Sequence, residues 1–200
     1  MNARNFDAEM RKITEEIIAF GGAKPRLLLH ACCAPCSSAC LERLFDAFDV
    51  TVLFYNPNIE EGEYEKRKTE LIRLLDATGW GHFIDCDHDE SEFYNAVKGL
   101  ESCPEGGERC AACFALRLER TAKVCKSGGF DYFATTLTVS PLKDANLINA
   151  LGFELAEKYG VRWLPTDFKK RNGYLRSIEL CEKYSLYRQN YCGCVFSLRQ

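Results

Sequence analysis

RLLLHACCAPC, residues 26–36, is the stretch that decides the fold. It begins with a short apolar run that is typical of a strand buried on both faces of a sheet. Cys32, Cys33 and Cys36 follow that run at once. Adjacent cysteines oxidise readily and are strained when bridged to each other, so their place at a strand end indicates a chemical role.

Short apolar runs alternate with helical patterns on both sides of this stretch. The predicted strands are Arg26–Ala31, Val50–Tyr55, His82–Asp85, Phe130–Thr136 and Val161–Leu164. The predicted helices are Phe6–Phe20, Ser38–Phe48, Glu60–Thr78, Glu90–Val97, Cys110–Lys126, Leu142–Tyr159 and Gly173–Tyr184. Strands separated by helices imply right-handed crossovers and a parallel sheet. We therefore predict an α/β, Rossmann-like fold that binds its ligand beyond the carboxyl ends of the strands.

The length of 200 residues suits a single α/β domain over residues 1–200. Within it, residues 1–24 form a predicted helical extension, and residues 165–200 a basic, cysteine-bearing segment that closes over the active site. Residues 161–200 carry eight basic and three acidic residues, whereas the other 160 carry 18 and 26. A basic segment on an acidic body favours contact with a polyanion, but a solvated helix face explains the charges equally well.

The composition also indicates a compartment. No apolar run approaches the roughly 20 residues that span a bilayer, and the polar N-terminus lacks the apolar region of a secretory signal. We therefore expect a cytoplasmic protein without a membrane partner. Twelve cysteines in a reducing compartment favour metal or redox chemistry over a disulfide framework.

Four cysteines supply the thiolates for a predicted metal centre. They are Cys32, Cys33, Cys110 and Cys113, the last two forming a C-x-x-C that opens a helix. We expect the helix N-terminus to lower the pKa of both C-x-x-C thiols. Four thiolates suit tetrahedral zinc or an iron–sulfur cluster. Adjacent cysteines reach two irons of a cluster more naturally than one zinc ion, which favours the cluster.

Other cysteines allow more than one interpretation. Cys192 and Cys194 form a C-x-C, which is either a strained, labile disulfide or a pair of metal ligands. Cys36, placed in the same loop as Cys32 and Cys33, is either a ligand or a neighbour. Cys103 is ambiguous. We interpret the rest as small core residues: Cys40, Cys86, Cys125 and Cys181.

Long motifs along the chain resemble those of the QueH-type epoxyqueuosine reductases. They are HACCAPC, GGERCAACFALRL, TTLTVSPLKD, DFKKRNGYLRS and YRQNYCGC, and the resemblance runs from about Arg26 to the C-terminus. It implies a fold similar to the nucleotide α-hydrolase (HUP) class, with the cysteine loop in place of a phosphate-binding loop. It also implies reduction of epoxyqueuosine in tRNA to queuosine, the last step in making that wobble nucleoside, without cobalamin.

The same resemblance implies the cofactors and their ligands. Cys32, Cys33, Cys110 and Cys113 would hold a [4Fe-4S] cluster. Cys192 and Cys194 would be the redox-active catalytic pair or would bind a second, mononuclear iron. The family often has an aspartate where this chain has Cys36, so the make-up of the second site stays open.

The substrate and its reduction need further groups. The predicted tRNA-binding residues are Lys169, Lys170, Arg171, Arg176 and Tyr191. The candidate proton donors are His30, Asp144, Asp167 and Tyr191. A flavodoxin or ferredoxin would serve as electron donor. Two alternatives remain: a zinc-binding structural or tRNA-binding protein, and a thiol–disulfide oxidoreductase without metal.

Overall fold

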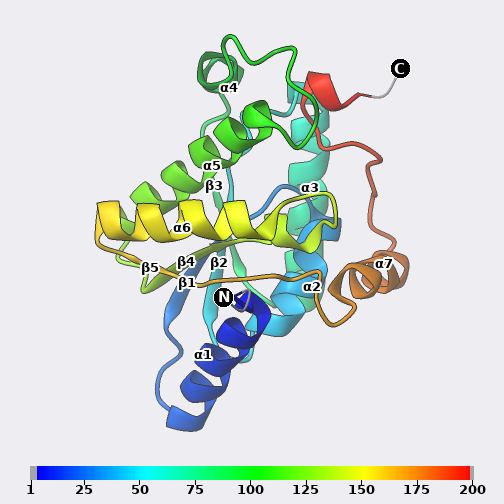
Figure 1. The fold of residues 1–200 in the computed structure, drawn as a ribbon. Coiled ribbons are helices and arrows are strands. Elements are labelled where there is room, and N and C mark those ends of the chain that lie inside the picture. Colours follow the sequence, from blue (N-terminus) through cyan, green and yellow to red (C-terminus); the bar gives the residue numbers. More distant parts are fainter. Residues whose placement is uncertain (1–3, 199–200) are drawn as a thin grey trace.

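A computed structural model describes residues 4–198 and places a five-stranded sheet between layers of helices (Figure 1). The strand order is β3-β2-β1-β4-β5, and all four pairings are parallel. The strands are β1 (Arg26–His30), β2 (Asp49–Phe54), β3 (His82–Asp85), β4 (Tyr132–Thr135) and β5 (Arg162–Trp163). The predicted α/β, Rossmann-like fold is confirmed, with strand ends shifted by up to two residues.

Seven α-helices and two 3-10 turns connect and cover the strands within residues 4–198. They are α1 (Phe6–Phe20), α2 (Ala34–Leu44), α3 (Glu61–Thr78), α4 (Glu90–Ala96), α5 (Glu108–Ser127), η1 (Thr136–Val139), α6 (Ala145–Tyr159), α7 (Gly173–Lys183) and η2 (Val195–Ser197). Helix α6 begins three residues later than predicted, because the Asp144 carboxylate caps its first turn by accepting from the backbone N–H groups of Asn146 and Leu147.

The start of α2 corrects a prediction. The helix begins at Ala34 rather than Ser38, after Cys33 in an extended conformation. Pro35 lies in the first turn, where a helix has no hydrogen bond to lose at the proline nitrogen. Cys36 therefore lies on a helix and not in a loop.

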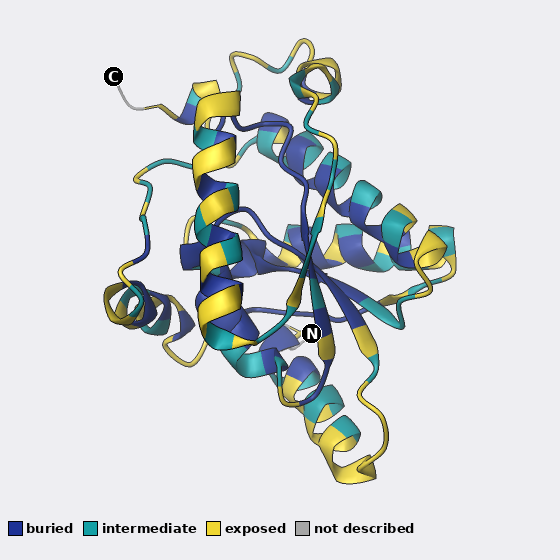
Figure 2. Cartoon of the chain, turned by 180° about the vertical axis from the view of Figure 1, so that it is seen from behind, coloured by how far each residue is buried: buried dark blue, intermediate teal, exposed yellow. Residues whose placement is uncertain are grey.

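The leucines of β1 explain why the sheet needs helices on both faces. Leu27, Leu28 and Leu29 are all fully buried, with alternate side chains on opposite faces. Leu27 and Leu29 pack in a core built with α2 and α3, and Leu28 packs in a core built with α5 and α6. Figure 2 shows the central strands β1 and β2 largely buried and the outer faces of the helices exposed.

The strand order creates a crevice beside β1. Strand β1 pairs with β2 on one side and with β4 on the other, and the connections after β1 and β4 cover opposite faces. Ligands of such sheets bind outside the carboxyl ends at this reversal. The cysteines that follow β1 and the turn η1 that follows β4 lie there.

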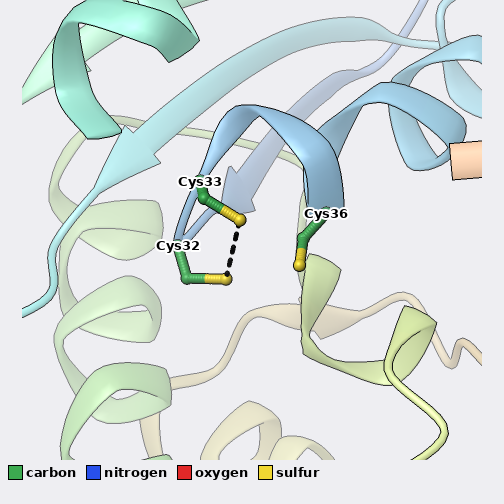
Figure 3. Close-up of side chains that lie close together, drawn as sticks. All are labelled: Cys32, Cys33 and Cys36. Carbon is green, nitrogen blue, oxygen red and sulfur yellow. Dashed lines mark hydrogen bonds between the residues drawn. The ribbon is translucent and has the colours of Figure 1, made fainter. Parts of the chain in front are cut away.

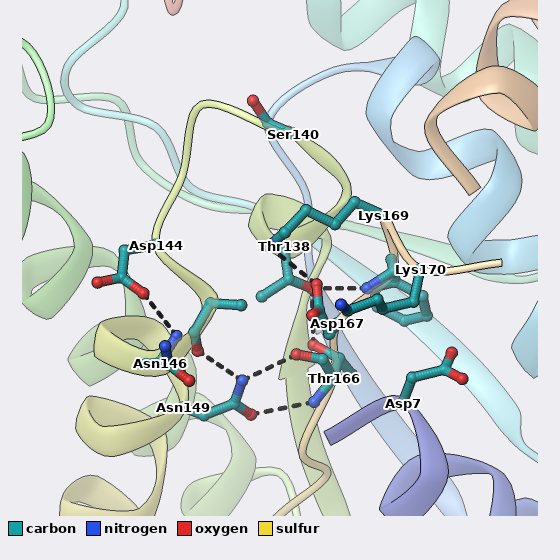
Figure 4. A network of polar contacts seen from close by, with 12 residues as sticks. Asp7, Thr138, Ser140, Asp144, Asn146, Asn149, Thr166, Asp167, Lys169 and Lys170 are labelled. Carbon is teal, nitrogen blue, oxygen red and sulfur yellow. Dashed lines mark hydrogen bonds and ion pairs between the residues drawn. The ribbon is translucent and has the colours of Figure 1, made fainter. Parts of the chain in front are cut away.

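Hydrogen bonds tie η1 to the chain that follows β5 (Figure 4). The hydroxyls of Thr138 and Thr166 are 2.9 Å apart, and the backbone N–H of Lys169 donates to the Thr138 carbonyl at 3.1 Å. The Asn149 amide of α6 donates to the Thr166 carbonyl at 2.8 Å. The turn after β4 and the segment after β5 are therefore held together at the edge of the crevice.

The two ends of the described chain lie on different parts of the fold. Helix α1 packs through Met10 against the core on the α2 side, and α7 packs against α2 (Figure 1). None of the helices in residues 4–198 is long and apolar enough to cross a membrane. That residues 1–24 are an extension with no role in the site stays a prediction.

Candidate functional site

Three cysteine thiols converge where β1 passes into α2 (Figure 3). They belong to Cys32, Cys33 and Cys36, which we call the trio. Their sulfur atoms all lie within 4.8 Å of one another, and those of Cys32 and Cys33 are 3.8 Å apart. Because the extended backbone at Cys33 leads straight into α2, Cys36 returns toward the strand end after one helical turn.

Contact and burial give the three thiols different acidities. Hydrogen bonds from the Cys33 and Cys36 thiols lower the pKa of Cys32. Burial raises the pKa of Cys33 to about 12, and the contact with Cys32 raises that of Cys36. The trio therefore favours one thiolate held by two thiols. The side-chain amide of Gln189 also donates to the Cys33 sulfur at 2.8 Å.

The C-x-x-C and the C-x-C meet beside the trio. Cys110 and Cys113 lie near the start of α5, and with Cys192 and Cys194 they line a cavity of about 90 Å³. We call it the four-cysteine cavity. Burial raises the pKa of Cys110 and raises that of Cys113 to about 11. The expectation that the helix N-terminus lowers both values is wrong, because the cost of burying a thiolate outweighs the helix dipole.

A second cavity, of about 160 Å³, opens beside the first. Cys32 and Cys36 line it, so we call it the trio cavity. Cys192 and Lys143 line both cavities. Burial disfavours the Lys143 ammonium, but the thiolates of Cys192 and Cys32 outweigh burial and raise its pKa. A positive charge thus stands between the two cysteine groups.

The buried Arg67 of α3 holds the C-terminal cysteine pair in place. Its guanidinium donates to the Cys192 carbonyl at 3.0 Å and the Tyr191 carbonyl at 3.4 Å. Glu63 neutralises it across a 2.7 Å ion pair. Gly193 packs directly on this guanidinium with φ +119°. The turn between the two cysteines therefore depends on a residue without a side chain.

Buried polar groups near the cysteines have hydrogen-bonding capacity to spare. Among residues 4–198, the amide nitrogen and oxygen of Asn58 and the Nη2 atom of Arg117 have no hydrogen-bond partner. Both residues line the four-cysteine cavity, and they are 5% and 1% exposed. Unpaired buried polar groups are costly, so such atoms mark a place prepared for a polar or charged group.

The donor set fits a thiolate-bound metal group. Seven thiols face the two cavities or form the trio, and thiolates select iron–sulfur clusters, zinc and other soft metals. Cys110 and Cys113 are not within the close spacing of the trio. Tetrahedral ligands about 2.3 Å from one ion lie about 3.8 Å apart, which the sulfur atoms of Cys32 and Cys33 match, whereas ligands of a cluster lie further apart. The residues thus fit both kinds of group, and the assignment of Cys32, Cys33, Cys110 and Cys113 to a cluster stays a prediction.

The predicted tRNA-binding residues fall into two places. Tyr191 lines the trio cavity, together with Tyr174 and Arg188. The run Lys169–Arg171 precedes α7 and lines neither cavity. In this run Lys170 is exposed. The structure therefore separates a cavity-lining aromatic from a basic run at the surface.

Two of the predicted basic residues already have carboxylate partners. Lys169 pairs with Asp167 at 2.9 Å (Figure 4). Arg176 pairs with Glu42 at 2.8 Å and with Glu179 at 2.6 Å. Their charge is partly neutralised, so the exposed Lys170 and Arg171 are better placed to meet a phosphate.

The four candidate proton donors also separate. His30 is fully buried between the Thr135 hydroxyl and the Tyr55 carbonyl, and burial lowers its pKa to about 3. A neutral, fully bonded imidazole packs the strand end and supplies no proton at neutral pH. Asp167 is paired with Lys169 and lines neither cavity. The two donors that reach a cavity are Asp144 and Tyr191.

The remaining cysteines agree with their predicted packing role. Cys40, Cys125 and Cys181 are buried, and Cys86 is half-buried after β3. All twelve cysteines lie within the described residues and all are free, so the structure contains no disulfide between Cys192 and Cys194.

Sequence reasoning gave no role to several residues that the structure brings to the site, although it placed the segment that contains Asn58 in the crevice. Arg117 follows Cys113 by four residues, a spacing that places both on one face of α5. Asn58 follows β2, at the edge where ligands bind. The sequence alone could therefore have indicated Arg117 and Asn58. No comparable pattern pointed to Arg67 or Gln189, because each meets the site through packing between distant segments.

Comparisons with known proteins agree with this geometry. Residues 27–200 match the family described as epoxyqueuosine reductase QueH. A protein of that name from Streptococcus pyogenes serotype M1 is 41% identical over 98% of this chain and 78% of its own length. A protein of the same name from Staphylococcus epidermidis is 43% identical over 96% of this chain and 84% of its own length. Another, from Thermotoga maritima, is 38% identical over 86% of this chain and 90% of its own length. The chain belongs to the epoxyqueuosine reductase QueH family.

Proposed function

We propose that this chain reduces epoxyqueuosine to queuosine at the wobble position of tRNA. The observation that carries the proposal is the meeting of seven cysteines from three chain segments in one crevice, next to two cavities. The relatives with high identity over most of the chain carry the name of this activity. The reaction removes the epoxide oxygen. With two electrons and two protons this oxygen leaves as water, and the two carbon atoms that carried it are joined by a double bond.

Four thiols would hold a [4Fe-4S] cluster, namely those of Cys32, Cys33, Cys110 and Cys113. Such a cluster supplies electrons one at a time. Cys36, Cys192 and Cys194 remain for a second iron or, in the case of the C-x-C, for redox chemistry of their own. A flavodoxin or ferredoxin would deliver the electrons.

The chain's own residues would bind and orient the modified base. The trio cavity is lined by the exposed Tyr174 and Leu142 and by Cys32 and Cys36. Its rim supplies an aromatic face on which a splayed base can stack. The Lys143 ammonium, which also lines this cavity, would donate a hydrogen bond to the departing oxygen and stabilise its negative charge. Tyr191 or Asp144 would pass on the proton.

The tRNA backbone would meet the basic run before α7. Lys170 and Arg171 are exposed there, and Arg43 of α2 holds their backbone by donating to both carbonyls, at 2.8 Å and 3.2 Å. Phosphate contacts of this kind position a nucleic acid without reading its sequence. Lys169 and Arg176 would support the same surface, and Tyr191 would contact the base in the trio cavity.

The test measures both the metal and the reaction. Anaerobically purified protein should contain iron and acid-labile sulfide. With a chemical reductant it should convert epoxyqueuosine in tRNA to queuosine, seen by mass spectrometry of the digested nucleosides. Replacing Cys113 by serine should abolish conversion, whereas Cys86→Ser, a half-buried cysteine outside both cavities, should leave it intact. Full conversion by the Cys113 variant would refute the proposed site.

A zinc-binding tRNA-binding protein is the second candidate. The observation that favours it is the trio, whose spacing suits one tetrahedral ion. Stoichiometric zinc without sulfide, together with tRNA binding and no loss of oxygen from the nucleoside, would establish a zinc-binding tRNA-binding protein and exclude the reductase.

A further inference from the structure

Arg117 is a buried cation without a carboxylate partner. Its side chain is 1% exposed, and within residues 4–198 it forms no ion pair. Its hydrogen bonds go to two neutral acceptors: Nη1 donates to the Asn56 amide oxygen at 3.3 Å and Nε to the Cys113 carbonyl at 3.4 Å. The third donor group, Nη2, has no partner in the described part of the chain.

The other large buried arginine of this region shows what is missing. Arg67 is equally buried, but it pairs with Glu63 at 2.7 Å and its remaining donors reach two backbone carbonyls. Its charge is therefore balanced without help. A guanidinium is always protonated in proteins, so Arg117 cannot escape its burial by losing the charge. Burying an uncompensated charge is strongly unfavourable, and an anion must balance it.

The cysteines are the groups that can provide this anion. Arg117 lines the four-cysteine cavity, where Cys113 lies one helical turn before it on α5. Two carboxylates line the cavity: Glu105 is exposed to solvent, and Asp144 caps α6 by accepting two backbone N–H groups. Asn58 lines the same cavity, and its amide nitrogen and oxygen find no partner among the described residues.

We propose that Arg117 and Asn58 form a cationic, hydrogen-bonding floor under the thiolate-bound centre and set its reduction potential. The inference rests on the proposed function, since it assumes a redox-active group on the cysteines. Arg117 balances the negative charge of the thiolates, and its free Nη2 group is available to donate to the sulfur atoms of the same cavity. Asn58 adds a second donor. Both are positioning residues, because they act on the centre and not on the substrate.

The physical consequence is a shift in potential. Taking up an electron makes the centre more negative, and a fixed, buried positive charge beside it stabilises that reduced state. Hydrogen bonds to the sulfur atoms of a cluster act in the same direction. Removing the charge or the amide should therefore move the potential to more negative values.

The test is a reductive titration of the loaded proteins, without tRNA, followed by visible absorption and electron paramagnetic resonance. Arg117→Gln should keep iron and sulfide but titrate at a clearly more negative potential than the natural chain. Arg117→Lys, which keeps the charge, should fall between the two. Arg120→Gln is the matched control, because it removes a charge from the same helix that is paired with Glu92 outside the cavity; it should titrate like the natural chain.

Each outcome decides one question. A loaded Arg117→Gln protein with an unchanged potential would overturn the inference alone. If that variant fails to fold or load, Asn58→Leu carries the test, and an unchanged potential there would overturn it equally. If the potential shifts in Arg117→Gln but the natural chain does not convert epoxyqueuosine, the proposed function is refuted and the inference stands. A natural chain without any reducible centre would overturn both.

Discussion

Replacing Gly193 by alanine tests whether the C-x-C turn is held against Arg67. Gly193 has φ +119°, which side chains rarely adopt. An added Cβ would lie 2.9 Å from Nη1 of Arg67 and 2.9 Å from Cγ1 of Ile59. Both neighbours are buried, so neither moves freely.

Two costs add in this substitution. Placing an L-residue in the left-handed region costs about 1–2 kcal/mol. Forcing a methyl group into a packed site costs about 1–3 kcal/mol more. We therefore expect the free energy of unfolding to fall by about 2–5 kcal/mol.

Gly99→Ala is the matched control, because it separates the two costs. Gly99 has φ +83°, but a Cβ there would meet nothing within 4 Å. Its loss should be limited to the backbone cost of about 1–2 kcal/mol. The difference between the two variants then measures the contact with Arg67 and Ile59.

Urea unfolding under reducing conditions, followed by circular dichroism, gives the free energy of each variant. If the C-terminal segment detaches instead of the whole fold weakening, trypsin should cut faster after the exposed Arg188 in the Gly193 variant. Equal losses in both glycine variants, without faster cleavage at Arg188, would refute the predicted packing of the C-x-C.

Three further predictions follow from single sites. Gly152→Ala would place a Cβ 2.3 Å from the Trp163 ring. The cost of overpacking, about 1–3 kcal/mol, should outweigh the better helix propensity of alanine and lower the melting temperature. A higher melting temperature would contradict this contact. Burial raises the pKa of Cys125 to about 11, so the thiol of the unfolded chain ionises first. The free energy of unfolding should therefore fall as pH rises from about 8.5 to 11, by up to about 1.4 kcal/mol per pH unit. Cys125→Ala should lose less stability over this range, and parallel stability–pH curves for the variant and the natural chain would rule the effect out. Lys170→Gln should weaken tRNA binding and its salt dependence more than Arg176→Gln does, because Arg176 is already paired with carboxylates; the opposite order in filter-binding titrations would overturn the proposed surface.

The alternation of strands and helices, and with it the parallel sheet, was readable from local pattern. Three consecutive leucines before HACC predicted a strand covered on both faces, and the structure buries all three completely. Because parallel strands end at one edge, the cysteines after β1 were expected in the crevice, where they lie. The long motifs around them sufficed to predict the family, which the comparisons confirm.

The tertiary structure alone decided which thiols meet. Cys36 joins Cys32 and Cys33 because α2 begins early. Cys110 and Cys113 line one cavity with Cys192 and Cys194, a neighbourhood that the sequence did not predict. The position of the C-x-C depends on a buried guanidinium of α3 more than a hundred residues earlier in the chain. A segment without regular secondary structure has no periodicity to predict, and its place is set by packing and by the charges that must be balanced when they are buried.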